Sequence, residues 1–178
     1  NSEGREANTG NILKTGTQSE NKMLWEGKFL RLPGSQRRAS FADRRNYKYK
    51  GKDIGKAFHL GIDLASTSHA GIPAANSGKV IFVGLEGIYG NSIILDHGFG
   101  LCSLYSHLSE THVAMGDMVK KGDIIGRTGM TGLAGGDHLH FSMMVHDTFV
   151  NPVEWWDATW IENNILSKIE HVHQLLKK

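Results

Sequence analysis

Short apolar runs separated by glycine-bearing turns dominate the pattern of hydrophobic and polar positions between Phe58 and Val150. The runs recur at intervals of roughly ten residues, which is typical of the strands of an antiparallel sandwich or barrel. No helical period is visible between them. Six runs are expected to form strands: Leu60–Leu64, Lys79–Val83, Asn91–Leu95, Leu101–Tyr105, Asp123–Gly126 and His140–Val145. The pattern therefore predicts a mainly β fold, a compact antiparallel sandwich or barrel-like domain.

The two ends of the chain follow other patterns. Asn151-Pro152-Val153-Glu154 combines a capping residue, a proline at the first helical position and a glutamate at N3, which predicts a short helix. Thr159-Trp160-Ile161-Glu162 repeats the capping box, and apolar residues at helical spacing then predict an amphipathic C-terminal helix over about 160–176. The sequence thus divides into a polar linker or disordered arm (1–22), a folded domain (23–157) and a helix packed on it or extending from it (158–178).

Basic residues are dense between Arg31 and Lys56. Within this stretch, Tyr47-Lys48-Tyr49-Lys50 alternates aromatic and basic side chains before Gly51, which predicts a half-exposed strand that enters a turn. A solvated strand face explains this pattern, and contact with an anionic polymer is the alternative. The basic residues are Arg37, Arg38, Arg44, Arg45, Lys48, Lys50, Lys52 and Lys56.

Composition narrows the class of protein. The 178 residues, 39% of them hydrophobic, suit one compact domain, and a net charge of +2 argues against a nucleic-acid partner. A single cysteine excludes an internal disulfide framework. No apolar run approaches the ~18 residues of a membrane-spanning helix. The chain begins at Asn1 and its first methionine is Met23, so we expect an upstream portion, which leaves open a membrane anchor, a coiled coil or an inhibitory segment.

Glycine and histidine are both concentrated in the β-rich region. Of 22 glycines and 10 histidines, 17 and eight lie between Gly51 and His146. Glycine adopts positive φ in tight turns at little cost, and histidine is the commonest metal ligand among the side chains. The concentration indicates a metal site within the β region.

Three segments carry the candidate ligands. His59-Leu60-Gly61-Ile62-Asp63 places an imidazole and a carboxylate on one side of an extended strand, with a glycine between them. His138 and His140 form a second pair with strand period, and His107 follows a predicted strand. Four histidines and a carboxylate suit a catalytic zinc site, which takes three protein ligands and keeps a position open for water. Spacing alone does not decide between His138 and His140 as the ligand.

These segments resemble the signature motifs of the lysostaphin/LytM-type zinc metallopeptidases, peptidase family M23. The three motifs are His59-x-x-x-Asp63, Tyr105-Ser106-His107-Leu108 and Gly136-Asp137-His138-Leu139-His140-Phe141. The intervening glycine pattern is also similar, from Phe41 to Trp156. One departure is Ala42, which stands where the family has a turn glycine. The resemblance implies a compact antiparallel β domain with a groove that crosses a zinc site.

The resemblance also implies roles for individual residues. His59, Asp63 and His140 would hold one zinc ion per chain, and His107 and His138 would serve as general base or stabilise the tetrahedral intermediate. The implied reaction is hydrolysis of cross-links or stem peptides of bacterial peptidoglycan by a zinc-bound water. The implied location is extracytoplasmic, with a Gram-negative periplasm favoured by the lone cysteine and by the absence of a recognisable wall-targeting domain.

Two other functions stay open at this stage. A non-catalytic or regulatory LytM-type domain would bind the cell wall or activate a separate amidase, although such members usually lack metal ligands that are all present here. A metal-binding structural domain would dock its basic segment on an acidic partner.

The remaining polar and aromatic candidates are expected to have structural or solvent roles. Cys102 is expected in the core, and Asp96 and Asp137 could be turn residues or could orient a ligand imidazole. Packing against the sheet is favoured over a sugar-stacking surface for Trp155, Trp156 and Trp160. Six histidines are left without a functional role: His69, His97, His112, His146, His171 and His173.

Overall fold

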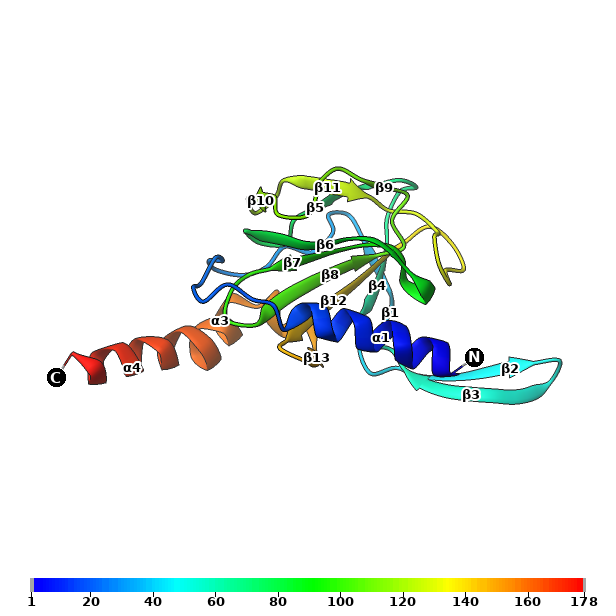
Figure 1. The fold of residues 1–178 in the computed structure, drawn as a ribbon, viewed down its shortest axis with the longest axis horizontal. Coiled ribbons are helices and arrows are strands. Elements are labelled where there is room, and N and C mark those ends of the chain that lie inside the picture. Colours follow the sequence, from blue (N-terminus) through cyan, green and yellow to red (C-terminus); the bar gives the residue numbers. More distant parts are fainter. Residues whose placement is uncertain (1, 178) are drawn as a thin grey trace.

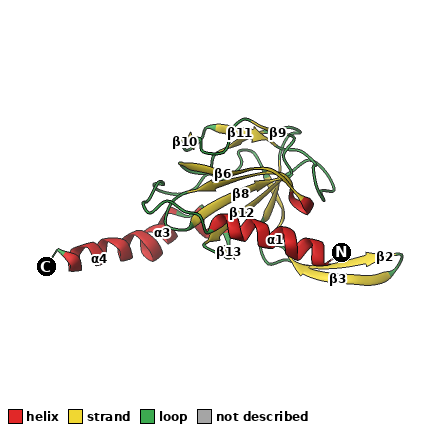
Figure 2. Cartoon of the chain, in the orientation of Figure 1, coloured by secondary structure: helices red, strands yellow, loops and turns green. Residues whose placement is uncertain are grey.

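Antiparallel strands form most of the regular structure in the computed structural model, which describes residues 2–177 (Figure 2). The strands are β1 (Gln36–Ala39), β2 (Arg44–Tyr49), β3 (Lys52–Phe58), β4 (Ile62–Ala65), β5 (Gly71–Pro73), β6 (Gly78–Glu86), β7 (Gly90–Asp96), β8 (Leu101–Ser106), β9 (Glu110–Thr111), β10 (Met118–Val119), β11 (Ile124–Arg127), β12 (Leu139–Val145) and β13 (Thr148–Val150). The helices are α1 (Ser2–Gly16), η1 (Gly87–Tyr89, a 3-10 turn), α2 (Pro152–Trp155), α3 (Ala158–Ile161), η2 (Glu162–Leu166, a π-helical turn) and α4 (Ser167–Leu176). All six predicted strands are present, so the mainly β prediction is confirmed.

One large sheet positions the candidate ligands. Its eight strands follow the order β1-β4-β12-β8-β7-β6-β10, with β13 paired to β12. A three-stranded sheet, β5-β11-β9, lies over one face of it, and the β2–β3 hairpin projects from the side (Figure 1). Each motif therefore lies on or beside the middle of the large sheet, because β4, β12 and β8 are neighbours in it.

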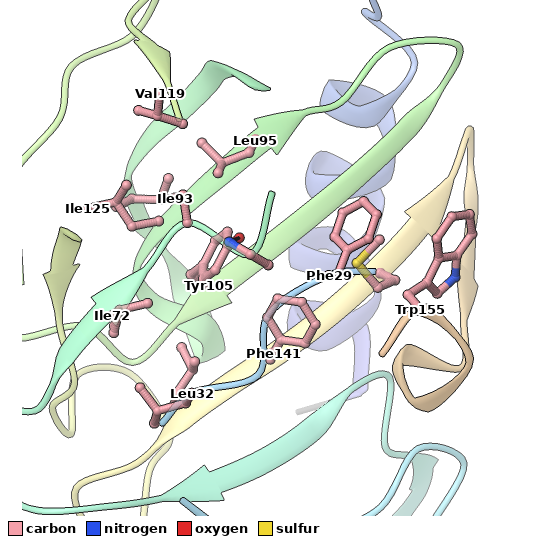
Figure 3. Packing of buried hydrophobic residues seen from close by; sticks show 14 of the residues in the cluster. Phe29, Leu32, Ile72, Ile93, Leu95, Tyr105, Val119, Ile125, Phe141 and Trp155 are labelled. Carbon is pink, nitrogen blue, oxygen red and sulfur yellow. Dashed lines mark hydrogen bonds between the residues drawn. The ribbon is translucent and has the colours of Figure 1, made fainter. Parts of the chain in front are cut away.

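Side chains alternate between the two faces of the large sheet, and each face packs in a different cluster of buried hydrophobic residues. On β12, Leu139, Phe141 and Met143 face the main core, whereas Met144 belongs to a second cluster on the opposite face. The main core also contains the segment before β1, through residues such as Phe29, as Figure 3 shows. Because successive strand residues point to opposite faces, His140 shares the face of the second cluster.

The amino-terminal region differs from the prediction of a disordered arm. Residues 2–16 form helix α1, which packs on the second cluster through the fully buried side chain of Ile12 (Figure 1). Its sequence mixes good helix formers with three glycines, at positions 4, 10 and 16, so local propensity does not predict the helix. Tertiary contacts stabilise the helix instead. The expectation of no helix within the β region is also wrong at one place, the 3-10 turn η1.

The basic hairpin matches its prediction. Arg44–Tyr49 and Lys52–Phe58 pair as β2 and β3, and the turn between them has positive φ at Lys50 (47°) and Gly51 (78°). Two successive positive φ values give the tight turn whose twist matches that of paired strands.

The carboxyl-terminal helices also follow the sequence closely. The Asn151 side chain accepts a hydrogen bond from the backbone N–H of Val153, so the predicted cap of α2 is confirmed. The predicted cap at Thr159 is wrong, because the carboxylate of Asp157 accepts from two backbone N–H groups and caps α3 instead. Ile165 and Leu166 of η2 still pack against the main core, and α4 extends away from the sheet (Figure 1). Among residues 2–177, no helix is both long and apolar enough to cross a lipid bilayer.

His97 was expected to have a structural or solvent role; it is fully buried, and it makes the stability of the fold depend on pH. Its ring lies edge-on to Phe29, Nδ1 donates to the carbonyl of Ser77 (2.7 Å), and Nε2 lies 2.7 Å from the hydroxyl of Ser103. Burial lowers the pKa of His97 to about 4, against the weaker opposing effects of Ser77 and Asp96.

We predict that His97→Gln flattens the pH dependence of unfolding. Unfolded chains take up the His97 proton below about pH 6.5 and the folded protein does so only below about 4, so folding stability falls between these values. The lowered pKa corresponds to about 3 kcal/mol across this window. The free energy of unfolding is measured with urea at pH 7 and at pH 4. Its decrease between the two pH values should be smaller in His97→Gln than in the parent, by about 3 kcal/mol. Equal losses in the two proteins would contradict the assignment.

Candidate metal centre

Two adjacent strands bring the candidate ligands together. Asp63 on β4 and His140 on β12 are directly paired across the antiparallel ladder, and His59 lies four residues before Asp63. Their donor atoms form a triangle: His59 Nε2 to Asp63 Oδ1, His59 Nε2 to His140 Nδ1, and His140 Nδ1 to Asp63 Oδ1 are each 3.0 Å. Two ligands at tetrahedral angles around a zinc ion lie about 3.3–3.5 Å apart, so the triangle is close to the size such an ion needs.

Hydrogen bonds on the far side of each ring fix which nitrogen faces the triangle. His59 Nδ1 lies 2.8 Å from the carbonyl of Ser40, which can only accept, so Nδ1 carries the proton and Nε2 presents a lone pair. His140 Nε2 lies 3.0 Å from the hydroxyl of Ser142, which leaves Nδ1 for the triangle. When His140 Nε2 donates to the Ser142 hydroxyl, its Nδ1 also presents a lone pair, and three electron-pair donors converge within 3.0 Å of one another. Such a set repels itself unless a cation lies among them, so these residues fit a metal ion.

Gly61 makes room for this arrangement. A Cβ atom at this position would lie 2.5 Å from the carbonyl oxygen of Phe141, 2.5 Å from the hydroxyl of Ser142 and 2.8 Å from the ring of His140. The glycine between His59 and Asp63 thus allows β4 and β12 to approach closely enough for the ligands to meet.

Asp63 is held as a carboxylate. Its Oδ2 accepts a hydrogen bond from Arg45 Nη2 at 2.8 Å, which leaves Oδ1 for the triangle. Burial alone would raise the pKa of Asp63, but the neighbouring imidazoles of His138, His140 and His59 outweigh it and lower the pKa far below its usual range. The group is therefore ionised, as a metal ligand requires.

His107 and His138 lie beside the triangle, with ring centroids 4.8 Å apart. His107 donates from Nδ1 to the carbonyl of Thr131 (2.8 Å), and His138 donates from Nδ1 to the carbonyl of Gly136 (2.8 Å). Both rings thus direct Nε2 away from those carbonyls, and His138 Nε2 lies 3.6 Å from Asp63 Oδ1. Burial lowers the pKa of His107 to about 4, and neighbouring His140 adds to this effect. His107 is consequently neutral near pH 7 and can accept a proton.

The pKa of His138 moves in the opposite direction. Burial opposes protonation of this ring, but the nearby Asp63 carboxylate and the hydrogen bond to the Gly136 carbonyl outweigh it and raise the pKa. The two imidazoles beside the triangle therefore differ in proton affinity, and one neutral and one more basic ring can divide proton acceptance from charge stabilisation.

The histidine cluster opens into a cavity of about 640 Å³. Its floor contains all four of these histidines and Asp63, and the β2–β3 hairpin forms one wall through Arg45 and Tyr47. Helix α1 lines it with Arg5, Glu6, Thr9, Gly10 and Leu13. The remaining lining residues are Lys56, Ala57, Phe58, Leu60, Ile88, Tyr89, Leu133 and Gly135. The volume suits a peptide segment rather than a single small ion or solvent molecule.

Several other candidates have structural positions. Cys102 is fully buried, and Asp96 accepts hydrogen bonds from Ser19 and Gly98 at a turn. Asp137 accepts from the Thr128 hydroxyl at 2.6 Å, so it ties its loop and does not orient a ligand imidazole. Trp155 packs edge-on against Phe29, which supports the packing interpretation for the tryptophans.

Five contributors to the site are absent from the sequence predictions. Arg45 was part of an undifferentiated basic stretch, and the Tyr89 ring, 5.7 Å from that of His140, lies on the unpredicted 3-10 turn. The backbone carbonyls of Ser40 and Thr131 carry no side-chain signature. Ser142 is different, because strand alternation places it on the same face as His140 and could have identified it.

The chain combines an antiparallel β fold with an ionised carboxylate and two imidazoles that converge on the floor of a cavity. This combination is typical of a metallopeptidase. The model of Peptidase family M23 matches residues 57–152, and the chain belongs to this family.

Known relatives agree with this assignment. The chain is 39% identical over 95 residues to the DD-carboxypeptidase/endopeptidase Mpg of Neisseria meningitidis, a match that covers 53% of this chain and 22% of the relative. It is 31% identical over 116 residues to the peptidoglycan DD-endopeptidase ShyB of Vibrio cholerae, covering 65% and 26%. The catalytic domain of lysostaphin from Staphylococcus simulans superposes with a TM-score of 0.61 at 30% identity, covering 72% and 96%. The chain matches about a quarter or less of the length of these curated relatives.

We predict that Gly61→Ala disrupts the triangle. The added methyl group would meet backbone and hydroxyl oxygen at 2.5 Å, so β4 and β12 must separate. Overpacking of this kind destabilises by about 1–3 kcal/mol. Zinc titration against a chelating dye should show much weaker binding, and urea unfolding should report the lost stability.

Gly55→Ala on β3 is the matched control, because a Cβ there meets nothing within 4 Å. It should retain parental zinc binding. If Gly61→Ala bound zinc as tightly as Gly55→Ala, the steric explanation would be wrong.

Proposed function

We propose that this chain is a zinc-dependent endopeptidase that hydrolyses peptide cross-links or stem peptides of bacterial peptidoglycan. The observation that supports it most strongly is the triangle of three electron-pair donors on the floor of a cavity, within a chain of the M23 family. We further propose that residues 23–157 are the peptidase domain and that the protein acts outside the cytoplasmic membrane, in the periplasm.

His59, Asp63 and His140 would hold the metal. Two nitrogens and one carboxylate oxygen, with no thiolate, form the three-ligand set of catalytic zinc sites. When bound, zinc supplies Lewis acidity that polarises a carbonyl group and lowers the pKa of water from 15.7 towards ~7. Arg45 would keep Asp63 in place, because it binds the carboxylate oxygen that the triangle does not use.

His107 and His138 would handle protons beside the reacting amide. The neutral ring of His107 has its Nδ1–H fixed on Thr131, so Nε2 is the atom that can take a proton. His138 has the higher proton affinity and would stabilise negative charge on the carbonyl oxygen as the amide is attacked. Each carbonyl partner keeps its ring in one orientation, which removes reorganisation at the moment of reaction.

The substrate proposal rests on the relatives. Mpg is a DD-carboxypeptidase/endopeptidase and ShyB is a peptidoglycan DD-endopeptidase. The family model matches residues 57–152, which contain the triangle and His107, so a shared peptide substrate class is the economical proposal. Such substrates lie outside the cytoplasm, which is the reason for the proposed location.

We predict that ligand and proton-transfer substitutions separate in two assays. His140→Ala should lose both zinc, measured at about one equivalent per parental chain, and peptide hydrolysis. His107→Ala should keep zinc and lose turnover by about 10²–10⁴-fold, the usual contribution of a general base. The assays are metal analysis and release of new amino termini from purified sacculi and defined muropeptides, with and without chelator.

His112→Ala is the matched control, since His112 is an exposed histidine outside the cavity whose ring contacts Glu110. It should behave as the parent in both assays. A parent that binds zinc yet releases no amino termini from sacculi of several cross-link chemistries would refute the proposed activity. Stimulation of a separate amidase by that inert chain would support a regulatory domain in its place.

A further inference from the structure

Positive charge is concentrated on the segment that forms β1, β2 and β3. Residues 36–58 contain eight basic and two acidic side chains, a net charge of +6, whereas the whole chain has a net charge of +2. The rest of the chain is therefore net acidic, and the positive charge is a local feature of these strands. Two of them form the hairpin that projects from the side of the large sheet (Figure 1).

The root of this hairpin, where β2 begins and β3 ends, belongs to the metal centre. Arg45 near the start of β2 binds Asp63, and β3 ends at Phe58, immediately before the ligand His59. The strands of the hairpin have six and seven residues, so its tip lies about 20 Å from its root. A peptide that extends from the triangle on this side therefore passes along the hairpin.

Three arginine and lysine side chains line the cavity, and two of them have partners within the protein. Arg45 binds the carboxylate of Asp63 at 2.8 Å. Arg5 donates to the hydroxyl of Tyr47 at 3.0 Å. The third, Lys56, is exposed, and its side chain has neither a hydrogen bond nor an ion pair with any of residues 2–177. Its ammonium group is thus available to an anion that enters the cavity.

Strand pairing places a second cation beside Lys56. Lys56 lies opposite Asn46 in the ladder and Arg44 lies opposite Phe58, so Arg44 and Lys56 occupy diagonal positions on one face of the hairpin. Diagonal neighbours are about 7–8 Å apart, which long side chains can span. Arg44 is also exposed, and within the described part of the chain its side chain has no hydrogen bond or ion pair. Two such charges repel each other, and an anion bound between them removes the repulsion.

A carboxylate is the anion that a peptide substrate can supply. An arginine binds it through a planar fork of N–H donors and a lysine adds a point charge, so the two side chains suit one carboxylate group. Phe58 is 65% exposed on the same face and presents an apolar surface to the rest of the peptide. Peptide cross-links contain carboxylates at chain ends and on acidic side chains unless these are amidated, whereas a bridge of glycines is neutral along its length.

We propose that Arg44 and Lys56 form a carboxylate-binding subsite, which selects peptide cross-links with free carboxylates over amidated or glycine-bridged ones. The proposal rests on the proposed function, because it names the substrate class of the same site. A carboxylate held at the root of the hairpin fixes one part of the peptide while the scissile amide lies at the triangle. The subsite therefore acts on KM and on the choice between substrates.

The experiment compares two defined cross-linked peptides that are identical except that their carboxylates are free in one and converted to amides in the other. Hydrolysis by the zinc-loaded full chain gives kcat and KM, and calorimetry in a His107→Ala background gives affinity without cleavage. The test variant combines Arg44→Gln with Lys56→Gln. The matched control combines Lys168→Gln with Lys177→Gln, which removes two exposed charges at the opposite end of the molecule (Figure 1).

We expect the parent to prefer the carboxylate peptide by about five- to tenfold in kcat/KM and in affinity, the effect of two exposed ion pairs. In the test variant this ratio should fall to about one, through a higher KM for the carboxylate peptide and not through kcat. The control should keep the parental ratio. Added salt should reduce the preference of the parent, because exposed ion pairs are screened.

A parent without this preference, or a test variant that keeps it, would overturn the subsite and leave the peptidase proposal intact. Equal losses in the test variant and the control would also overturn it, since net charge would then explain the preference. If the test variant lost binding to vesicles of anionic phospholipid and kept the peptide preference, the basic face would be a membrane contact instead.

The binding measurements separate this proposal from the proposed function. The expected affinities together with no hydrolysis by any chain that retains His107 would support the subsite and refute the peptidase. Failure of both peptides to bind any of the chains would overturn both.

Discussion

The convergence of three electron-pair donors on one point is the constraint on which the site depends. His59, Asp63 and His140 approach to 3.0 Å, and each imidazole has its other nitrogen bound to a partner outside the triangle, which leaves one nitrogen of each ring for a metal ion. Such an arrangement is unfavourable unless a cation compensates it, and the surrounding sheet must supply the rigidity that maintains it. Neighbouring β4 and β12 do so, and Gly61 lets them come close enough.

Strand alternation places core residues and site residues on opposite faces of the same sheet. One face of β12 packs Leu139, Phe141 and Met143 into the main core, and the other carries the polar site. Residues next to a ligand in sequence therefore stabilise the fold, and residues two positions away support the ligand. Ser142 illustrates this relation, since its hydroxyl contacts His140 from the adjacent same-face position.

The cavity has walls of different origin. Its floor belongs to the region that matches the M23 family, whereas α1 lies outside that region and the β2–β3 hairpin enters it only at its end. The floor and the walls of the cavity therefore come from different parts of the chain. Arg45 joins the two, because it extends from the hairpin to the carboxylate of Asp63.

The sequence alone determined the strands, the short capped helix, the C-terminal helix and the set of five polar residues. These features depend on local period, on capping residues and on spacing within one strand, all of which can be seen in neighbouring positions. Only the tertiary structure decided that His140 rather than His138 completes the triangle, that Arg45 binds Asp63, and that residues 2–16 fold as a helix over the site. Those outcomes depend on contacts between segments distant in sequence, such as Ile12 with the cluster on the large sheet, and no local pattern encodes them.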